Sequence, residues 1–226
     1  LAPVCKYIKD YFGDDLHPGD VIFHNDVFSL GNQNNDVAVY KPIFLGGKLV
    51  AWTAVKGHQA DIGGNVRGGY NPNAVEVWQE ALRIPPVKVV EKGKLRKDVW
   101  NLIFANIRLD IVQHDMKAEM GACTVGERRL QELLKKYGVE SYEAHKQALF
   151  DATRKMMEAE IAKIPNGNYS GEGYVYFDGR FVGSKYTIRV DIEVKDKHIK
   201  FDYSRTDPQT NGFVNGTFTS SASATI

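Results

Sequence analysis

The sequence predicts an α+β fold in which antiparallel or mixed sheets flank a helical segment. Residues up to about 95 and from 166 onward carry short apolar runs and period-two alternation, which are typical of strands. Residues 96–165 instead space their apolar side chains three or four apart, which is typical of helices. Strands, then helices, then strands favour the α+β class over alternating βαβ units. We therefore expect a strand-rich region at 1–95, a helical segment at 96–165, and an antiparallel β region at 166–226 that continues past this chain.

The first region begins with a helix-like stretch at 1–12, and short strands follow it. Residues 21–23 form a strand-type run after a Pro-Gly-Asp turn. The Gly46-Gly47 pair lies between apolar runs and indicates a hairpin, because glycine readily adopts the positive φ angles of tight turns. This hairpin places His58 at the end of a strand. Residues 61–72 contain two glycine pairs and an Asn-Pro step, so we expect a loop that can approach a ligand closely.

The middle region predicts three helices. One covers Val99 to Ile107, a second runs from about 111 to 137 and stops before Gly138, and a third begins at a Ser141 cap and ends near 164. Their apolar stripes are expected in the core. Beyond them, the clean alternation at 186–194 predicts an antiparallel sheet with one wet face.

Composition excludes several functions. The chain has 226 residues and a formal net charge of +1, so no bulk charge recruits nucleic acid or a membrane surface. It has only two cysteines, Cys5 and Cys123, which suits a reducing compartment. No apolar run approaches the roughly 20 residues of a membrane span, and no signal peptide is evident. We expect a cytoplasmic protein, and both ends have the character of a fragment of a larger subunit.

Carboxylate and imidazole side chains gather around the predicted hairpin. His58 and Asp61 lie three residues apart at a strand-to-loop junction, Asp36 opens the partner strand, and Asp26 ends the preceding one. Such mixed donors suit Mn²⁺, Zn²⁺ or Fe²⁺ better than a metal that prefers thiolates. Asp115 is a further candidate ligand or a base. The structural alternative is that these side chains only cap turns or hold the fold.

Several ordered motifs resemble the hydantoinase B/oxoprolinase family. They are Phe-His-Asn-Asp at 23–26, Asn-Asp at 35–36, Gly-His-Gln-Ala-Asp-Ile-Gly-Gly at 57–64, residues 80–88 with Ile-Pro-Pro, Ala-Asn-Ile-Arg at 105–108, and segments 126–130 and 211–216. The resemblance covers nearly the whole chain. Residues 24–26, 68–72 and 77–80 look most like the alpha subunit of acetone carboxylase.

The resemblance implies an ATP-dependent ketone carboxylase that converts acetone and bicarbonate to acetoacetate and ATP to AMP. A hydantoinase A-like partner would use the ATP, a small third subunit would complete the hetero-oligomer, and this subunit would hold Mn²⁺. His58 and Asp61 are carried over as ligands, followed by Asp36, and then by Asp26 and Asp115.

The general base is less defined. His24 and His114 are the candidates for proton removal from the ketone. Other members of the family open lactam or hydantoin rings with ATP, so a ring hydrolase subunit is the second hypothesis, and a non-catalytic scaffold subunit is the third.

Overall fold

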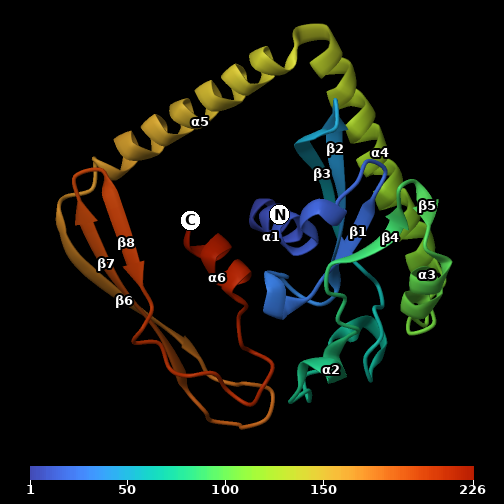
Figure 1. The fold of residues 1–226 in the computed structure, drawn as a ribbon. Helices are drawn as coiled ribbons and strands as arrows, with labels where there is room; N and C mark the ends of the chain where they lie inside the picture. Colours follow the sequence, from blue (N-terminus) through green and yellow to red (C-terminus); the bar gives the residue numbers. More distant parts are fainter. The chain divides into compact units, whose positions relative to one another are not determined.

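The structure is a computed structural model that describes residues 1–226, and it divides into two compact units. The first unit comprises Leu1–Glu132, Gly216–Ala224 and Ile226, and the second comprises Leu133–Asn215 and Thr225. Both units combine helices with antiparallel sheets, which confirms the α+β class (Figure 1). The three-region division at 95 and 165 stays a prediction.

The first unit contains a five-stranded antiparallel sheet in the order β3-β2-β1-β4-β5. The strands are β1 (Val21–His24), β2 (Asp36–Leu45), β3 (Lys48–His58), β4 (Val87–Glu91) and β5 (Lys94–Leu95). The predicted hairpin is confirmed, because Gly46 and Gly47 turn the chain at φ 56° and 78° and Leu45 pairs with Lys48. At the opposite end of this hairpin, Asp36 pairs with His58.

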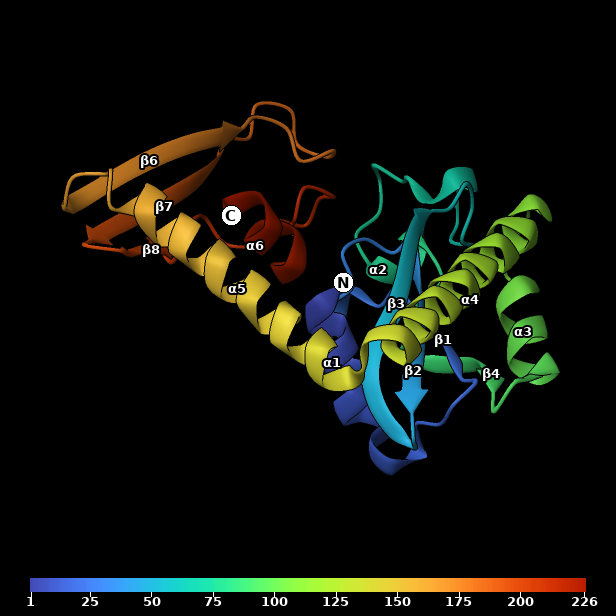
Figure 2. The ribbon, with the colours of Figure 1, turned by 90° about the horizontal axis from the view of Figure 1, so that it is seen from above.

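Helices cover both faces of this sheet (Figure 2). On one face, α1 (Ala2–Phe12) packs Val4 and Ile8 against Ile22 and Tyr40. On the other face, α3 (Lys97–Phe104) and α4 (Ile111–Tyr137) close a second apolar core. That core contains Val21, Phe23, Val37, Val39 and Val89 of the strands and Trp100, Phe104, Val112, Met116 and Cys123 of the helices. Apolar cores therefore cover both faces of the sheet.

Short elements complete the first unit. They are the 3-10 turns η1 (Gly13–Asp15), η2 (Val27–Ser29) and η3 (Arg67–Gly69), with α2 (Val77–Glu80) and α6 (Phe218–Thr225). The α6 segment returns to the loop before β2: the hydroxyls of Thr217 and Thr219 donate to the backbone carbonyls of Asn32 and Leu30, each at 3.0 Å. No helix in the structure is both long enough and apolar enough to cross a bilayer.

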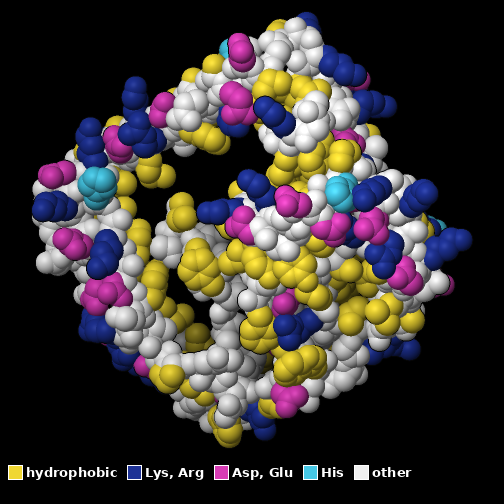
Figure 3. All heavy atoms as spheres, in the orientation of Figure 1, with side chains coloured by type: hydrophobic (Ala, Val, Ile, Leu, Met, Phe, Trp, Pro, Cys, Tyr) yellow, Lys and Arg dark blue, Asp and Glu magenta, His cyan; other side chains and the backbone are white.

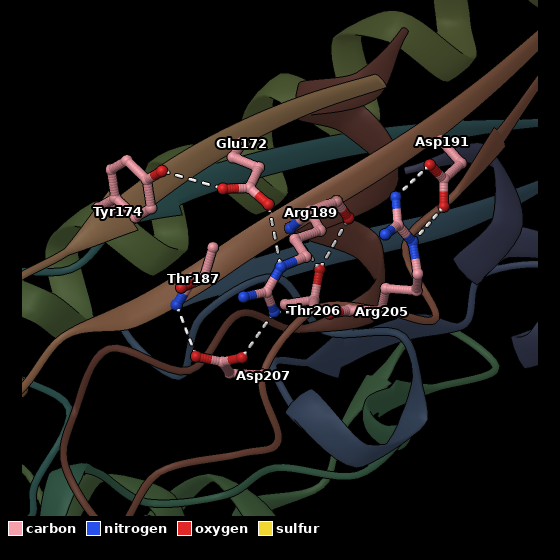
Figure 4. Close-up of polar contacts among 8 residues, drawn as sticks. All are labelled: Glu172, Tyr174, Thr187, Arg189, Asp191, Arg205, Thr206 and Asp207. Atoms are coloured by element: carbon pink, nitrogen blue, oxygen red, sulfur yellow. Dashed lines mark hydrogen bonds and ion pairs between the residues drawn. The ribbon is translucent and has the colours of Figure 1, made fainter. Parts of the chain in front are cut away.

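The second unit contains α5 (Val139–Ile161) and the antiparallel sheet β6-β7-β8. Its strands are β6 (Gly167–Val175), β7 (Tyr186–Lys195) and β8 (His198–Asp202). The predicted antiparallel sheet is confirmed. One of its faces is polar: Arg189 binds Glu172 at 3.1 Å and Asp207 at 2.9 Å, while the Tyr174 hydroxyl donates to Glu172 (Figure 4). The other face is not buried, since Tyr169, Ile188 and Phe201 are exposed. Tyr169, Ile192 and Phe201 are aligned across the three strands.

Two helix predictions were wrong in detail. The third helix begins at Val139 after Gly138, so Ser141 lies inside it and does not cap it. Its apolar stripe is also not core, because α5 has no buried residue and Leu149 and Met156 are exposed. Hydrophobic side chains are visible at the surface along this helix (Figure 3). Leu102 of α3 is likewise 69 % exposed. A three-to-four spacing reports which residues share a helix face, but burial of that face requires a neighbour, and α5 lacks one along most of its length in its own unit.

Candidate functional site

The Asp36–His58 pair is the candidate site that the sheet register builds directly. These residues are paired across β2 and β3, and the His58 Nδ1 lies 2.8 Å from Asp36 Oδ1. The His58 side chain is 59 % exposed, whereas that of Asp36 is 12 % exposed. Asp36 Oδ2 accepts from Asn32 Nδ2 at 2.8 Å and lies 3.3 Å from Lys56 Nζ. Burial acts to raise the pKa of Asp36, but the hydrogen bonds from Asn32, His58 and Lys56 outweigh it and lower that pKa.

Because Asp36 is ionised, it can only accept a hydrogen bond, so the His58 Nδ1 carries the donated proton. In the neutral ring this tautomer leaves a lone pair on Nε2. The exposed imidazole can then accept a proton from a substrate or water, or coordinate a metal while a carboxylate orients it. The pair is thus an exposed imidazole oriented by a carboxylate, an arrangement that suits a base or a metal ligand.

Asp61 performs a different task. It is fully buried, and its carboxylate accepts from Gly63 N at 3.0 Å and from Arg108 N and Nη1, each at 3.2 Å. Arg108 also donates to the carbonyls of Gly64 and Val66, so it ties the glycine-rich loop together. The carboxylate of Asp61 is already neutralised by a guanidinium.

Asp26 is also bound by an arginine. Arg83 Nε and Nη2 donate to its two oxygens at 2.9 and 3.2 Å, and the guanidinium lies over the rings of Phe28 and Trp78. The expected ligands therefore do not converge: the structure contains no group of three or more His, Cys, Asp or Glu side chains arranged to hold a metal ion. Of the expected ligands, Asp36 and His58 are in contact, and these two alone do not make up the metal site that the sequence predicts.

His24 is placed inside the protein. It is 1 % exposed, and burial lowers its pKa to about 4, so it is neutral at pH 7. Ser29 Oγ lies 3.0 Å from both His24 Nε2 and Asp26 Oδ2. Asp26, ionised and paired with Arg83, must receive the hydroxyl proton, so His24 donates to Ser29. This chain of hydrogen bonds supports Asp26 and leaves the serine oxygen without an activating base.

His114 and Asp115, the remaining candidates, are exposed on α4. Asp115 lies one turn before Glu119, a residue that the sequence reasoning missed. The Oε1 of Glu119 accepts from Gln59 Nε2 at 2.8 Å, and its Oε2 is buried without a partner. Burial, with repulsion from Asp115, raises the pKa of Glu119 to about 7 despite the bond from Gln59. A signal existed in the sequence, because Glu119 lies between the apolar positions Met116 and Cys123 of one helix face.

The raised pKa of Glu119 predicts a pH-dependent stability. Its pKa in the folded state, about 7, exceeds the unfolded value of 4.5. The contribution of Glu119 to the stability of the fold is therefore complete below pH 4.5 and is lost as the pH rises through 7. Replacing Glu119 with Gln removes this loss. In urea unfolding, the free energy of unfolding of the E119Q variant relative to the parent should rise from pH 5 to pH 8. The rise should be less than about 1.4 kcal/mol per pH unit, because the carboxyl is only half-buried. Glu132→Gln, an exposed change on the same helix, should leave the pH dependence unaltered.

Comparisons with known proteins place this architecture. The family model for hydantoinase B/oxoprolinase matches residues 1–226, and the chain belongs to that family. The beta subunit of caprolactamase from Pseudomonas jessenii is 42 % identical over 217 residues, covering 95 % of this chain and 37 % of that protein. A putative D-/L-hydantoinase subunit of Pseudomonas sp. (strain NS671) is 31 % identical, covering 92 % and 37 %. The chain thus spans little more than a third of these relatives.

Solved structures show the same fold. The crystal structure of ATP-dependent caprolactamase from Pseudomonas jessenii superposes with a TM-score of 0.93 at 41 % identity, covering 99 % of this chain and 38 % of that one. A nucleotide-free structure of acetone carboxylase superposes with a TM-score of 0.87 at 18 % identity, covering 98 % and 31 %. At that identity the second likeness concerns the fold alone.

Proposed function

We propose that this chain is part of an ATP-dependent cyclic-amide hydrolase subunit that opens a lactam or hydantoin ring. The observation that carries the proposal is the Asp36–His58 pair, an exposed imidazole oriented by a largely buried carboxylate. The 42 % identity with a caprolactamase subunit supports the substrate class. The second hypothesis of the sequence reasoning thereby becomes the favoured one.

The pair supplies the general base that ring opening needs. His58 Nε2 removes a proton from water, the water oxygen bonds to the amide carbonyl carbon, and the carbon–nitrogen bond of the ring breaks. The ring nitrogen takes up a proton as it leaves, and the imidazolium that forms is stabilised by Asp36. ATP would act on a hydantoinase A-like partner subunit within a cytoplasmic hetero-oligomer.

The expected Mn²⁺, Zn²⁺ or Fe²⁺ stays a proposal, and no step above uses it. A metal would have to add ligands to the Asp36–His58 pair from elsewhere in the assembly. Ketone carboxylation with bicarbonate also stays a prediction.

The test is activity of the full subunit assembled with its ATP-using partner. With ATP and a cyclic amide, we expect His58→Ala to lower kcat by about 10²–10⁴-fold and Asp36→Asn by at least about tenfold, because the base and then its orientation are lost. His198→Ala, an exposed histidine of the second unit, is the control. Full ring opening by the His58 variant would overturn the proposal. Bicarbonate-dependent product from a ketone would favour the carboxylase, and neither activity from an intact complex would favour the scaffold.

A further inference from the structure

A carboxyl group from α4 is seated against the end of the strand that carries His58. A Cβ atom added to Gly57 would lie 2.2 Å from Glu119 Oε1, so any side chain at this position would displace the carboxyl from its present place against the strand. The same Oε1 accepts from the side chain of Gln59 at 2.8 Å. Glu119 therefore contacts the residues on both sides of His58.

Gln59 links this carboxyl to the partner strand. Its side chain is 3 % exposed, and its backbone N–H donates to the carbonyl of Asn35, the residue before Asp36, at 2.9 Å. Gln59 is thus bonded to α4 through its side-chain amide and to the residue that precedes β2 through its backbone. Both contacts flank the Asp36–His58 pair, so they restrict how the two side chains can separate.

We propose that Glu119 is a positioning residue for the Asp36–His58 pair, acting through Gln59 and the close approach at Gly57. This inference rests on the proposed function only for its activity readout. Glu119 touches neither the imidazole nor a substrate in this arrangement. It fixes the backbone from which His58 projects.

The surroundings indicate that Glu119 works in its neutral form. Gln59 donates to Oε1, which leaves the proton on Oε2, the oxygen that is buried without a partner. Asp115 and Cys123 lie one turn before and one turn after it on α4, and the nearby Lys41 is engaged by Glu127 at 3.2 Å. No cation is bonded to Oε2 of Glu119. Ionisation would therefore leave an uncompensated charge and weaken the packing of this carboxyl against the strand.

Two variants of the assembled enzyme test the inference. In Glu119→Ala, amide hydrogen exchange in residues 56–62 should accelerate by about fivefold as one hydrogen bond is lost, and kcat for ring opening should fall by up to about 100-fold with KM little changed. In Glu119→Gln, which keeps an acceptor for Gln59 and carries no charge, kcat at pH 6 should be restored. The Gln variant should also lose any decline that the parent shows above pH 7. Glu132→Gln serves as the matched control.

The outcomes separate this inference from the proposed function. Unchanged exchange and unchanged kcat in the Ala variant would overturn the positioning role. If exchange accelerates and the Gln variant restores slow exchange, while neither parent nor variant opens a ring, the positioning role stands and the proposed function falls. An equal loss in the Ala and Gln variants at every pH would also contradict the inference, because a neutral isostere should suffice.

Discussion

Replacing Lys88 with Met should destabilise the first unit by about 3–5 kcal/mol, because it leaves a buried carboxylate without its cation. Lys88 is 5 % exposed, and its Nζ lies 3.1 Å from both Asp20 Oδ2 and Asp15 Oδ2. Asp20 is fully buried and also accepts from the backbone N–H groups of His17 and Lys92. Lys88 thus joins β4 to the turn that precedes β1. Urea unfolding measures the loss directly.

Two comparisons identify the cause. The double variant Lys88→Met with Asp20→Asn should recover part of the lost stability, since the uncompensated charge is then absent. Lys94→Met, on the exposed strand β5, should change the stability by no more than about 0.5 kcal/mol. Equal destabilisation by both lysine variants would show that the buried ion pair is not responsible.

Replacing Arg108 with Met should cost about 3 kcal/mol and loosen the loop after His58. Asp61 would keep the backbone donors of Gly63 and Arg108 but would lose its counter-charge. The carbonyls of Gly64 and Val66 would lose their hydrogen-bond donor. The value lies at the low end for a buried pair because the Arg108 side chain is 37 % exposed. Amide exchange in residues 61–70, measured beside urea unfolding, should report the opened loop.

A nearby arginine provides the comparison for this variant. Arg67 lies in the same loop and is exposed, so Arg67→Met should leave both measurements close to those of the parent. Asp61→Asn combined with Arg108→Met should be more stable than Arg108→Met alone. If the single arginine variant were as stable as the parent, Asp61 would not depend on a guanidinium and its assignment as a metal ligand would regain support.

The sequence predicted the local structure well, but it predicted less well which side chains of the candidate site come together. The Gly46-Gly47 turn and the alternation beyond it are local signals, and they placed Asp36 and His58 on paired strands as the structure has them. The sequence did not pair Arg83 with Asp26 or Arg108 with Asp61, because the two residues of these pairs lie 57 and 47 positions apart in the chain. Spacing predicts that four donors lie near one end of the sheet, but it does not show which of them already has a cationic partner.

The return of the chain to the loop before β2 has a consequence for how the protein acquires its structure. Thr217 and Thr219 form hydrogen bonds with residues that lie 185 and 189 positions earlier in the sequence. Residues Leu133–Asn215 of the second unit lie between the bonded partners in the sequence. Contacts between residues so far apart in the sequence form late, and they reduce the folding rate. During synthesis, the segment that leads into Asp36 must wait for more than 180 further residues before its last hydrogen bonds can close.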